Sequence, residues 1–322
     1  MLFTGIDISK LTFNASILND NKYLDHKFKN NDQGFKAFIK WVEKFKLNSI
    51  FCMESTGIYS LSLAKFLDQQ QKTTLLVNPI KTHAFCRMEM SRNKTDKADA
   101  QNIAKFCQYL FDTEQISKYI FKPRSEAFEE LRYLIVRLEQ INQLKAQEKN
   151  HLEASKSKKT IHSIKSFLRH IEKQIIALEK DIKDLVTSNS DIKKQVALLN
   201  SIPAIGDKTA WRILAYLGDV SLFSSSKQVT SYAGLNPRVE QSGSSINKSR
   251  LSKMGNKRLR KSMYMPALVA IRHHPKMVDM YNKLQERGKP KKVAIAAVMR
   301  KLLVIAYGVL KSGKNYDLNY IS

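Results

Sequence analysis

The first 30 residues alternate between apolar runs of strand length and polar turn signals. Strand-like runs lie at Leu2–Ile8, Thr12–Leu18 and Lys22–Phe28, and Ser9-Lys10 and Asn19-Asp20 separate them. Three closely spaced runs of this kind predict an antiparallel meander.

The segment from Gln33 to Val77 alternates between helical and strand-like spacing of its apolar residues. Apolar residues at helical spacing run from Gln33 to Phe45, and a strand follows at Ser49–Met53. A second helix is predicted from about Ser60 to Gln70, and a strand at Thr73–Val77. Three hairpin strands followed by alternating helices and strands are the order of an RNase H-like fold, so we expect an α/β domain over residues 1–125.

The central segment, residues 126–190, is helical and charged. Apolar residues recur every three or four positions from Phe128 to Leu144 and again from Ile164 to Leu185, with Ser155 to Thr160 between the two stretches. The charge is almost balanced, with 12 basic and 10 acidic residues. This pattern predicts two long amphipathic helices in an antiparallel or intermolecular coiled coil. A dimerisation role is the favoured interpretation, and a helical spacer is the alternative.

The last segment, residues 191–322, is helical with Gly- and Ser-rich interruptions and contains no convincing run of strands. Leu199–Ala210 has the pattern of a helix, a tight turn and a new helix, as in a helix-hairpin-helix. Gly206 is expected to free the turn, and backbone N–H groups at the start of the next helix, beside Lys208 and Thr209, are expected to bind a DNA phosphate. A simple helical turn packed in a core is the alternative.

The chain is strongly basic, with a formal net charge of +26 over 322 residues. Residues 191–322 hold 24 Lys and Arg against 7 Asp and Glu, so most of this charge lies in the last segment. Because these residues are interleaved with Gly, Ser and Asn, the charge indicates a nucleic-acid partner. A merely soluble basic surface is the alternative.

Other composition signals are weaker. The three cysteines, Cys52, Cys86 and Cys107, have no metal-ligand spacing, and Cys52 lies in an apolar run typical of a core. No uninterrupted apolar run reaches the roughly 18–20 residues of a membrane span. We therefore expect a reduced, cytoplasmic protein with no membrane association and no secretory signal.

Four carboxylates in the first hundred residues are the strongest chemical signal. Asp7 interrupts one apolar run, Glu54 ends another, and Asp96 and Asp99 are three positions apart. The ends of neighbouring strands direct their side chains to one edge of a sheet, so Asp7 and Glu54 could meet there. Asp96 and Asp99 are three positions apart and share one face of a helix, and Thr95 is placed to cap that helix. Carboxylate oxygens suit Mg²⁺, and two such ions can hold the oxygens of a phosphodiester. Asp96 alone has a simpler explanation, because an acid at a helix N-terminus is favoured by the helix dipole.

A second candidate site is the serine-rich loop around Ser242. Basic residues surround its serines in the sequence, namely Arg238, Lys248, Arg250, Lys253, Lys257, Arg258 and Arg260. A serine hydroxyl is a poor nucleophile until a base or metal activates it. Nearby cations stabilise the charge of a phosphoryl transition state. Taken alone, such a loop is more often a phosphate-binding surface than a catalytic one.

These motifs together resemble those of a known family, the DEDD transposases of the IS110 insertion-sequence family, which are RNA-guided recombinases. The N-terminal matches are Gly5-Ile6-Asp7, Glu54-Ser55-Thr56-Gly57-Ile58-Tyr59, and the string from Arg92 to Ala100 that contains Lys94, Asp96 and Asp99. The C-terminal matches are the helix-turn-helix pattern, Ala233-Gly234-Leu235, Pro237-Arg238, Ser242-Gly243, Ser245, Lys253 and Gly255-Asn256. The resemblance covers nearly the whole chain. One departure is Asn247-Lys248, where many members carry a glycine.

The resemblance implies a RuvC-like domain that holds Mg²⁺ or Mn²⁺ on Asp7, Glu54, Asp96 and Asp99. It also implies that Ser242 is the nucleophile and forms a phosphoserine with DNA. A structured guide RNA would pair with target and donor DNA, and a homodimer would assemble into a tetramer in which one subunit's acids meet another's serine. Such an enzyme would work on the bacterial nucleoid.

The sequence thus predicts an RNA-guided DNA transposase with three parts, 1–125, 126–190 and 191–322. The residues expected to contact nucleic acid are Lys94, Gly206, Lys208, Thr209, Arg238, Lys248, Arg250, Lys253, Asn256, Arg258 and Arg260. One alternative is a Holliday-junction-type, metal-dependent endonuclease without a covalent serine. Another is a nucleic-acid-binding protein without catalysis, which the four intact acids disfavour.

Overall fold

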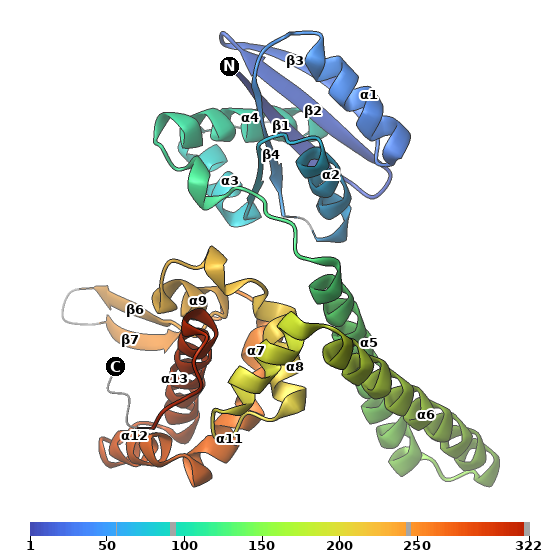
Figure 1. The fold of residues 1–322 in the computed structure, drawn as a ribbon, viewed down its shortest axis with the longest axis vertical. Helices are drawn as coiled ribbons and strands as arrows, with labels where there is room; N and C mark the ends of the chain where they lie inside the picture. The colour runs from blue at the N-terminus through green and yellow to red at the C-terminus, as the bar shows by residue number, and fades with distance from the viewer. Residues whose placement is uncertain (56, 91–94, 243–245, 319–322) are drawn as a thin grey trace. The chain divides into compact units, whose positions relative to one another are not determined.

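The computed structural model describes residues 1–55, 57–90, 95–242 and 246–318. The chain divides into two compact units, Met1–Pro123 and Arg124–Ser322 (Figure 1). Lys94 lies outside the described residues, and so do the side chains of Ser242 and Lys248, whose backbone is described. The division between 125 and 126 falls close to the boundary of the units. The further division at 190 stays a prediction.

The first unit is built on a five-stranded mixed sheet. Its strands are β1 (Leu2–Ile8), β2 (Thr12–Asn19), β3 (Lys22–Lys29), β4 (Ser49–Glu54) and β5 (Thr74–Val77). Their order in the sheet is β3-β2-β1-β4-β5, with the first three antiparallel and β4 and β5 parallel to β1. The predicted meander and α/β order are confirmed.

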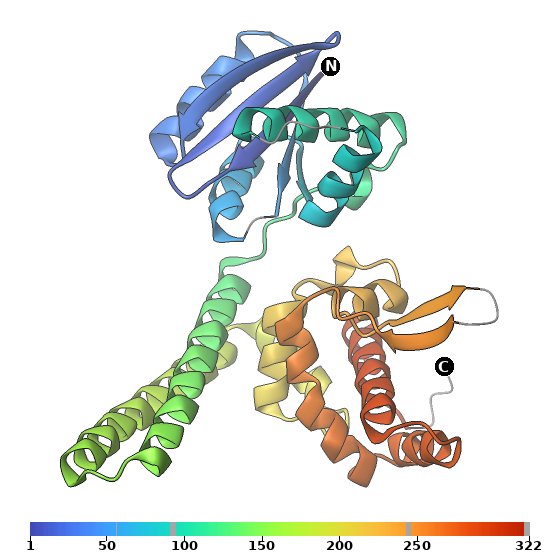
Figure 2. The same cartoon turned by 180° about the vertical axis from the view of Figure 1, so that it is seen from behind.

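Helices cover both faces of this sheet, because β1 and β4 are apolar on both sides. α1 (Asp32–Glu43) and α2 (Ile58–Gln69) pack on the face that carries Leu2 and Ile6. α3 (Pro79–Met88) and α4 (Asp96–Asp112) pack on the opposite face, where Figure 2 shows α4 crossing the strands. A three-layer α/β/α arrangement results.

The approach of α4 to β1 depends on Gly5. A Cβ atom at Gly5 would collide with the carbonyl oxygen of Ala100 and the backbone nitrogen of Ala104. Only glycine therefore lets the helix backbone lie directly on the strand. Thr95 caps the helix, as predicted, since its Oγ1 accepts a hydrogen bond of 3.1 Å from the Ala98 N–H.

The helix α3 was not predicted from the sequence. Its hydrophobic periodicity is weak, because one of its two buried residues is the polar Thr82, but its start carries a recognisable signal. Asn78 caps the helix by accepting a hydrogen bond of 2.9 Å from the Ile80 N–H, and Pro79 occupies the first helical position. The dipeptide Asn78-Pro79 was the available clue.

The second unit begins with a long helical hairpin. α5 (Glu126–Ala154) and α6 (Lys158–Ser188) pack against each other along most of their length (Figure 1). The predicted apolar stripes form the contact, and their inner residues Leu131 and Ile182 join the core of the whole unit. The intramolecular antiparallel pairing is thus confirmed. Dimerisation through these helices stays a prediction.

The predicted helix, turn and helix are present as α7 (Ser190–Asn200) and α8 (Asp207–Leu217). The expected role of Gly206 in the turn is wrong. Gly206 is extended, with φ −106° and ψ 177°, and the left-handed residue of the turn is Ala204, with φ 79°. Gly206 instead occupies the position before the first residue of α8, where nothing lies within 4 Å of an added Cβ.

The rest of the unit is a helical core. It contains α9 (Ser226–Tyr232), α10 (Lys257–Ser262), α11 (Tyr264–His273), α12 (Pro275–Glu286) and α13 (Lys291–Ser312). Among the described residues, α13 is the one helix long and apolar enough to cross a membrane, with a mean hydropathy of 2.0. Its inner face packs in the core, which is the place of an apolar helix in a globular unit.

The expectation that residues 191–322 contain no strands is wrong at the serine-rich loop around Ser242. Strands β6 (Pro237–Ser242) and β7 (Ile246–Leu251) form a two-stranded antiparallel sheet (Figure 1). Its residues are mostly polar or charged, so they lack the alternating apolar pattern by which strands are recognised. The hairpin is therefore defined by its backbone pairing and has no hydrophobic alternation to mark it in the sequence.

Candidate active site

Sheet register brings two of the four predicted acids together. The last paired residues of β1 and β4 are Ile6 and Met53, and Asp7 and Glu54 each come one position later. They therefore lie side by side near the carboxyl ends of adjacent parallel strands. Asp7 also follows Gly5 by two positions, so both residues face α4.

The other two acids lie in the first turn of α4, the helix that Gly5 admits to the sheet. Asp99 is half-buried and Asp96 is exposed. Burial, followed by the negative charges of Asp99, Asp96 and Glu54 in that order, raises the pKa of Asp7 from 3.8 to about 6. The other three predicted acids therefore act electrostatically on Asp7. Their joint role in a metal site stays a prediction.

A buried threonine on α3 holds Glu54. The Thr82 hydroxyl donates a closely spaced hydrogen bond to Glu54 Oε1, and Thr82 Oγ1 also lies 2.9 Å from the Pro79 carbonyl oxygen. The Cys86 thiol, one turn further along α3, has its pKa raised by burial and then by Asp99 and Glu54. One face of α3 therefore borders the carboxylates.

A second contact braces α4 against the edge of the sheet. Gln101 Nε2 donates hydrogen bonds to both carboxylate oxygens of Asp25 on β3, at 3.1 and 3.0 Å. Lys97 Nζ lies 3.1 Å from Asp25 Oδ2. Because Lys97 and Gln101 flank Asp99 along the helix, this brace fixes the turn that carries the predicted acids.

The carboxylate oxygens of the four acids suit a hard divalent cation, although the side chains do not converge on a single point. Among the described residues, no three His, Cys, Asp or Glu side chains form a group that could hold a metal ion. Four carboxylates at one sheet edge nevertheless leave a negative charge that raises the pKa of Asp7. Mg²⁺ or Mn²⁺ binds such oxygens and would offset this charge.

The second candidate site is the hairpin in the other unit. Ser242 is the last residue of β6, and its backbone pairs with Ile246 of β7. Arg238 and Arg250 are direct cross-strand partners near the base of the hairpin, and both are exposed. Two basic side chains therefore lie on the same face of the hairpin.

Some of the predicted nucleic-acid-binding residues make structural contacts instead. Arg260 donates hydrogen bonds from one guanidinium nitrogen to the carbonyl oxygens of Ala233, at 2.9 Å, and Lys253, at 3.1 Å. The Asn256 side chain caps α10 by accepting from the Arg258 and Leu259 N–H groups. Arg260 and Asn256 therefore shape the loop, while Lys253 and Arg258 are exposed.

The start of α8 is also partly occupied by its own neighbours. Lys208 forms an ion pair with Glu179 of α6, and Asn200 Nδ2 donates to Asp207 Oδ1 at 2.6 Å. Gly206 is exposed and Thr209 is half-buried. Backbone N–H groups begin the helix here, but Asp207 adds a negative charge to its first turn.

Comparison with known proteins now adds to this geometry. Residues 4–155 match a transposase family of the DEDD IS110 type, and residues 196–282 match the "Transposase IS116/IS110/IS902 family". The "Pilin gene-inverting protein" of Moraxella lacunata is 33% identical over 98% of this chain and 97% of its own length. The protein of the same name from Moraxella bovis matches equally well.

The chain belongs to the IS110 family of transposases. Shorter matches agree with this assignment. The 43.6 kDa protein of insertion element IS110 from Streptomyces coelicolor is 28% identical over 49% of this chain and 38% of its own length. This IS110-family transposase is an enzyme of DNA transposition or recombination within an insertion sequence.

Three structural features of the transposase were missed by the sequence reasoning. Thr82 lies in the unpredicted helix α3, Asp25 is separated from Gln101 by 75 intervening positions, and Gly5 was noted only as part of a motif. A glycine two positions before a buried acid was the one local signal available. Long-range partners such as Asp25 and Gln101 leave no such signal.

Proposed function

We propose that this transposase cleaves and rejoins DNA through a phosphoserine on Ser242, with a divalent metal held by Asp7, Glu54, Asp96 and Asp99. The observation that carries the proposal is the half-buried position of Asp7 near a strand end, where the charges of Asp99, Asp96 and Glu54 all act on it. Together with the family's DNA-directed activity, it favours a metal-assisted phosphodiester reaction over simple DNA binding.

The carboxylates would bind Mg²⁺ or Mn²⁺ through their oxygens, and Asp7 must lose its proton to take part. When bound, such an ion supplies Lewis-acid stabilisation of the charge that develops on a phosphodiester. Thr82 keeps one Glu54 oxygen oriented by hydrogen bonding, and Gly5 and Asp25 keep the start of α4 in place.

The covalent step proposed for Ser242 is a transesterification. The Ser242 oxygen forms a bond to the scissile phosphorus and releases its proton, and the bond from phosphorus to the leaving DNA hydroxyl oxygen breaks. That oxygen takes up a proton. In the second step, a hydroxyl of another DNA end attacks the phosphoserine, which restores the phosphodiester and frees the serine. No water is consumed, so strand exchange needs no outside energy source.

The DNA and RNA contacts are proposed on charge and placement. Basic residues line the hairpin and its base, where Arg238, Arg250, Lys253 and Arg258 are exposed. Gly206 and Thr209 at the start of α8 would contact a phosphate in a helix-hairpin-helix manner. RNA guidance, a RuvC-like N-terminal fold, and a homodimer that forms a tetramer complete the proposal and rest on the family resemblance. The reaction would take place on nucleoid DNA in the cytoplasm.

The relatives suggest what the reaction rearranges. The similar Moraxella proteins are described as pilin gene-inverting proteins. Inversion and transposition both require breaking and rejoining DNA strands, so the same chemistry would serve either outcome. We propose movement or inversion of a DNA segment as the biological result.

A trapping assay tests the covalent step. Purified protein is incubated with Mg²⁺, with the RNA encoded beside its gene, and with DNA that carries the ends of the element. The mixture is then denatured. The wild-type chain is expected to yield a denaturant-stable DNA adduct, and Ser242→Ala to yield none. Ser244→Ala, a change of the same size nearby in the sequence, is the control and should retain the adduct. Metal-dependent cleavage without any adduct would instead indicate a hydrolytic nuclease.

A further inference from the structure

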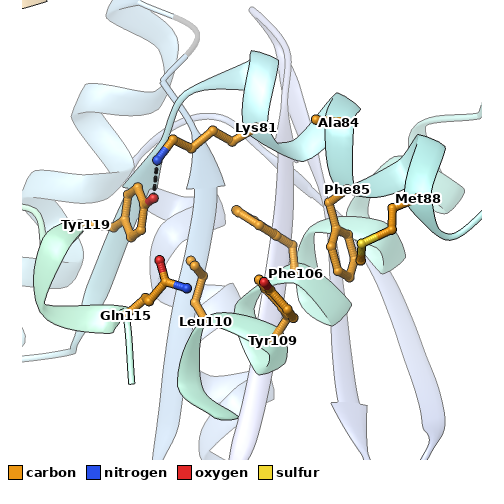
Figure 3. Close-up of a pocket in the computed structure, with 9 residues that line it drawn as sticks. All are labelled: Lys81, Ala84, Phe85, Met88, Phe106, Tyr109, Leu110, Gln115 and Tyr119. Carbon is orange, nitrogen blue, oxygen red and sulfur yellow. Dashed lines mark hydrogen bonds between the residues drawn. The ribbon is translucent and has the colours of Figure 1, made fainter. Parts of the chain in front are cut away.

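A groove between α3 and α4 lies outside the site described so far (Figure 3). Its cavity volume is about 300 Å³, and its lining includes Lys81, Phe85, Met88, Phe106, Tyr109 and Tyr119. This volume is near the lower end for ligand pockets, which suits a small planar group better than an extended ligand.

The walls of the groove are aromatic and partly open to solvent. The Phe85 ring centroid lies 5.2 Å from that of Phe106 and 5.4 Å from that of Tyr109. The Phe106 and Tyr109 rings are nearly parallel, with an angle of 16° between their planes. Tyr109 is 39% exposed and Met88 is 62% exposed. Exposed flat and polarizable surface of this kind favours stacking with another flat ring.

A positive charge lies at one end of the groove. Lys81 Nζ is 4.7 Å from the centre of the Tyr119 ring and donates a hydrogen bond to the Tyr119 hydroxyl (Figure 3). A groove that combines ring faces with a cation is complementary to a ring that carries an anion. A nucleotide has both parts, and a chain of net charge +26 attracts its phosphates.

The groove and the carboxylates use different faces of one short helix. Thr82 and Cys86 of α3 border Glu54, whereas Lys81, Phe85 and Met88 border the groove. A base held in the groove would therefore belong to a strand that passes beside α3, the helix whose other side borders Glu54. We propose that this groove binds one unpaired nucleobase of a single strand, with its phosphate beside Lys81.

The proposal rests on the DNA-directed activity of the family and not on the phosphoserine or the metal. A protein segment is the competing occupant, because exposed apolar grooves also serve as protein interfaces. The nucleobase is favoured by the lysine at the end of the groove and by the positive charge of the chain. An apolar protein anchor would gain nothing from either feature.

The test measures binding of short single strands to full-length Ser242→Ala protein, which removes covalent capture. Strands of about 12 nucleotides, as DNA or as RNA, carry a single 2-aminopurine whose fluorescence falls when it stacks. Tyr109→Leu is expected to weaken binding about tenfold and to abolish most of the quenching, since base stacking contributes this much. Tyr109→Phe should retain both. If the protein binds DNA strands more tightly than RNA strands, or the reverse, this preference identifies which nucleic acid supplies the base.

The charge is tested separately. Lys81→Gln should lower the slope of log affinity against log salt by about 0.7, the value for one phosphate of a single strand. Two variants elsewhere serve as controls: Tyr133→Leu on α5, where the tyrosine is 52% exposed, and Lys40→Gln on α1. Neither control should change the quenching.

Two outcomes would overturn the proposal. In the first, the Tyr109→Leu and Lys81→Gln proteins bind the strands with the same affinity as the protein with an unmodified groove, and the 2-aminopurine fluorescence is quenched to the same extent. In the second, Tyr109→Leu leaves strand binding unchanged but alters the sedimentation of the nucleic-acid-free protein, which would identify a protein interface. Because Ser242 is already absent from this assay, neither outcome depends on the covalent mechanism.

Discussion

The carboxylates and the serine are held by opposite kinds of structure. Asp7 and Glu54 lie near the carboxyl ends of central strands in a sheet covered on both faces, and α4 is fixed by Gly5 and Asp25. Ser242 ends a strand of a two-stranded hairpin, the least supported kind of sheet. The comparison indicates that a packed core fixes the acidic half of the proposed site, whereas the backbone that carries the serine belongs to a hairpin of two paired strands.

The largest expected effect is the loss of activity in Asp7→Asn. An amide keeps the shape of the side chain but removes its charge, so a metal ion loses a ligand in the middle of the cluster. We expect Mg²⁺-dependent strand cleavage to fall about 1000-fold, since a bound metal contributes several kcal/mol to such reactions. Unchanged cleavage would remove Asp7 from the site.

The same substitution is expected to stabilise the metal-free protein. The pKa of Asp7 is about 6 in the folded chain and near 3.8 in the unfolded one, so the folded state binds more protons between these values. The stability contribution therefore falls as pH rises from about 4 to about 6 and stays low above that. Asp7→Asn avoids this loss of stability. At pH 7.5 with EDTA, its free energy of unfolding should exceed that of the wild-type chain by about 1–2 kcal/mol, after allowance for solvent screening.

The hairpin supplies the contrasting variant. Ser242→Ala removes one hydroxyl from the last residue of β6, so the free energy of unfolding should change by less than about 0.5 kcal/mol. Both variants lose activity for different reasons, and only Asp7→Asn gains stability. Equal stability of the two in urea unfolding would contradict the contrast between a strained acidic cluster and a peripheral serine.

A glycine pair tests the rigidity of the acidic half. Gly5→Ala places a methyl group against the Ala100 and Ala104 backbone and is expected to destabilise the protein by about 2–3 kcal/mol. Gly308→Ala is the control, because Gly308 is helical and exposed with nothing near an added Cβ. It should stabilise by about 0.5–1 kcal/mol. Denaturant midpoints that shift equally would show that α4 is not held by close packing.

A smaller effect is expected at Thr82. Thr82→Val keeps the shape but removes the hydrogen bond to Glu54, and the Mg²⁺ concentration for half-maximal cleavage should rise about tenfold. Thr82→Ser keeps the hydroxyl and should restore the normal metal dependence. A purely structural role for Thr82 would lower the amount of active enzyme and leave the metal dependence unchanged.

The sequence predicted the elements that have a buried face better than the contacts between them. The strands β1 to β5 and the stripes of α5 and α6 were predictable, because their apolar residues recur at the period of the element. The hairpin of β6 and β7 was missed because its sequence lacks a regular alternation of apolar and polar residues. Thr82 and Asp25 were missed because their partners lie far along the chain, where only folding brings them together.

The proposed pairing of acids and serine from different chains is tested most directly by mixing two inactive variants. Asp7→Ala protein retains Ser242, and Ser242→Ala protein retains the four acids. If the acids of one chain act on the serine of another, co-refolded mixtures should regain a denaturant-stable DNA adduct, formed only on the Asp7→Ala chain. No adduct in a mixture that still binds DNA and associates would contradict the account.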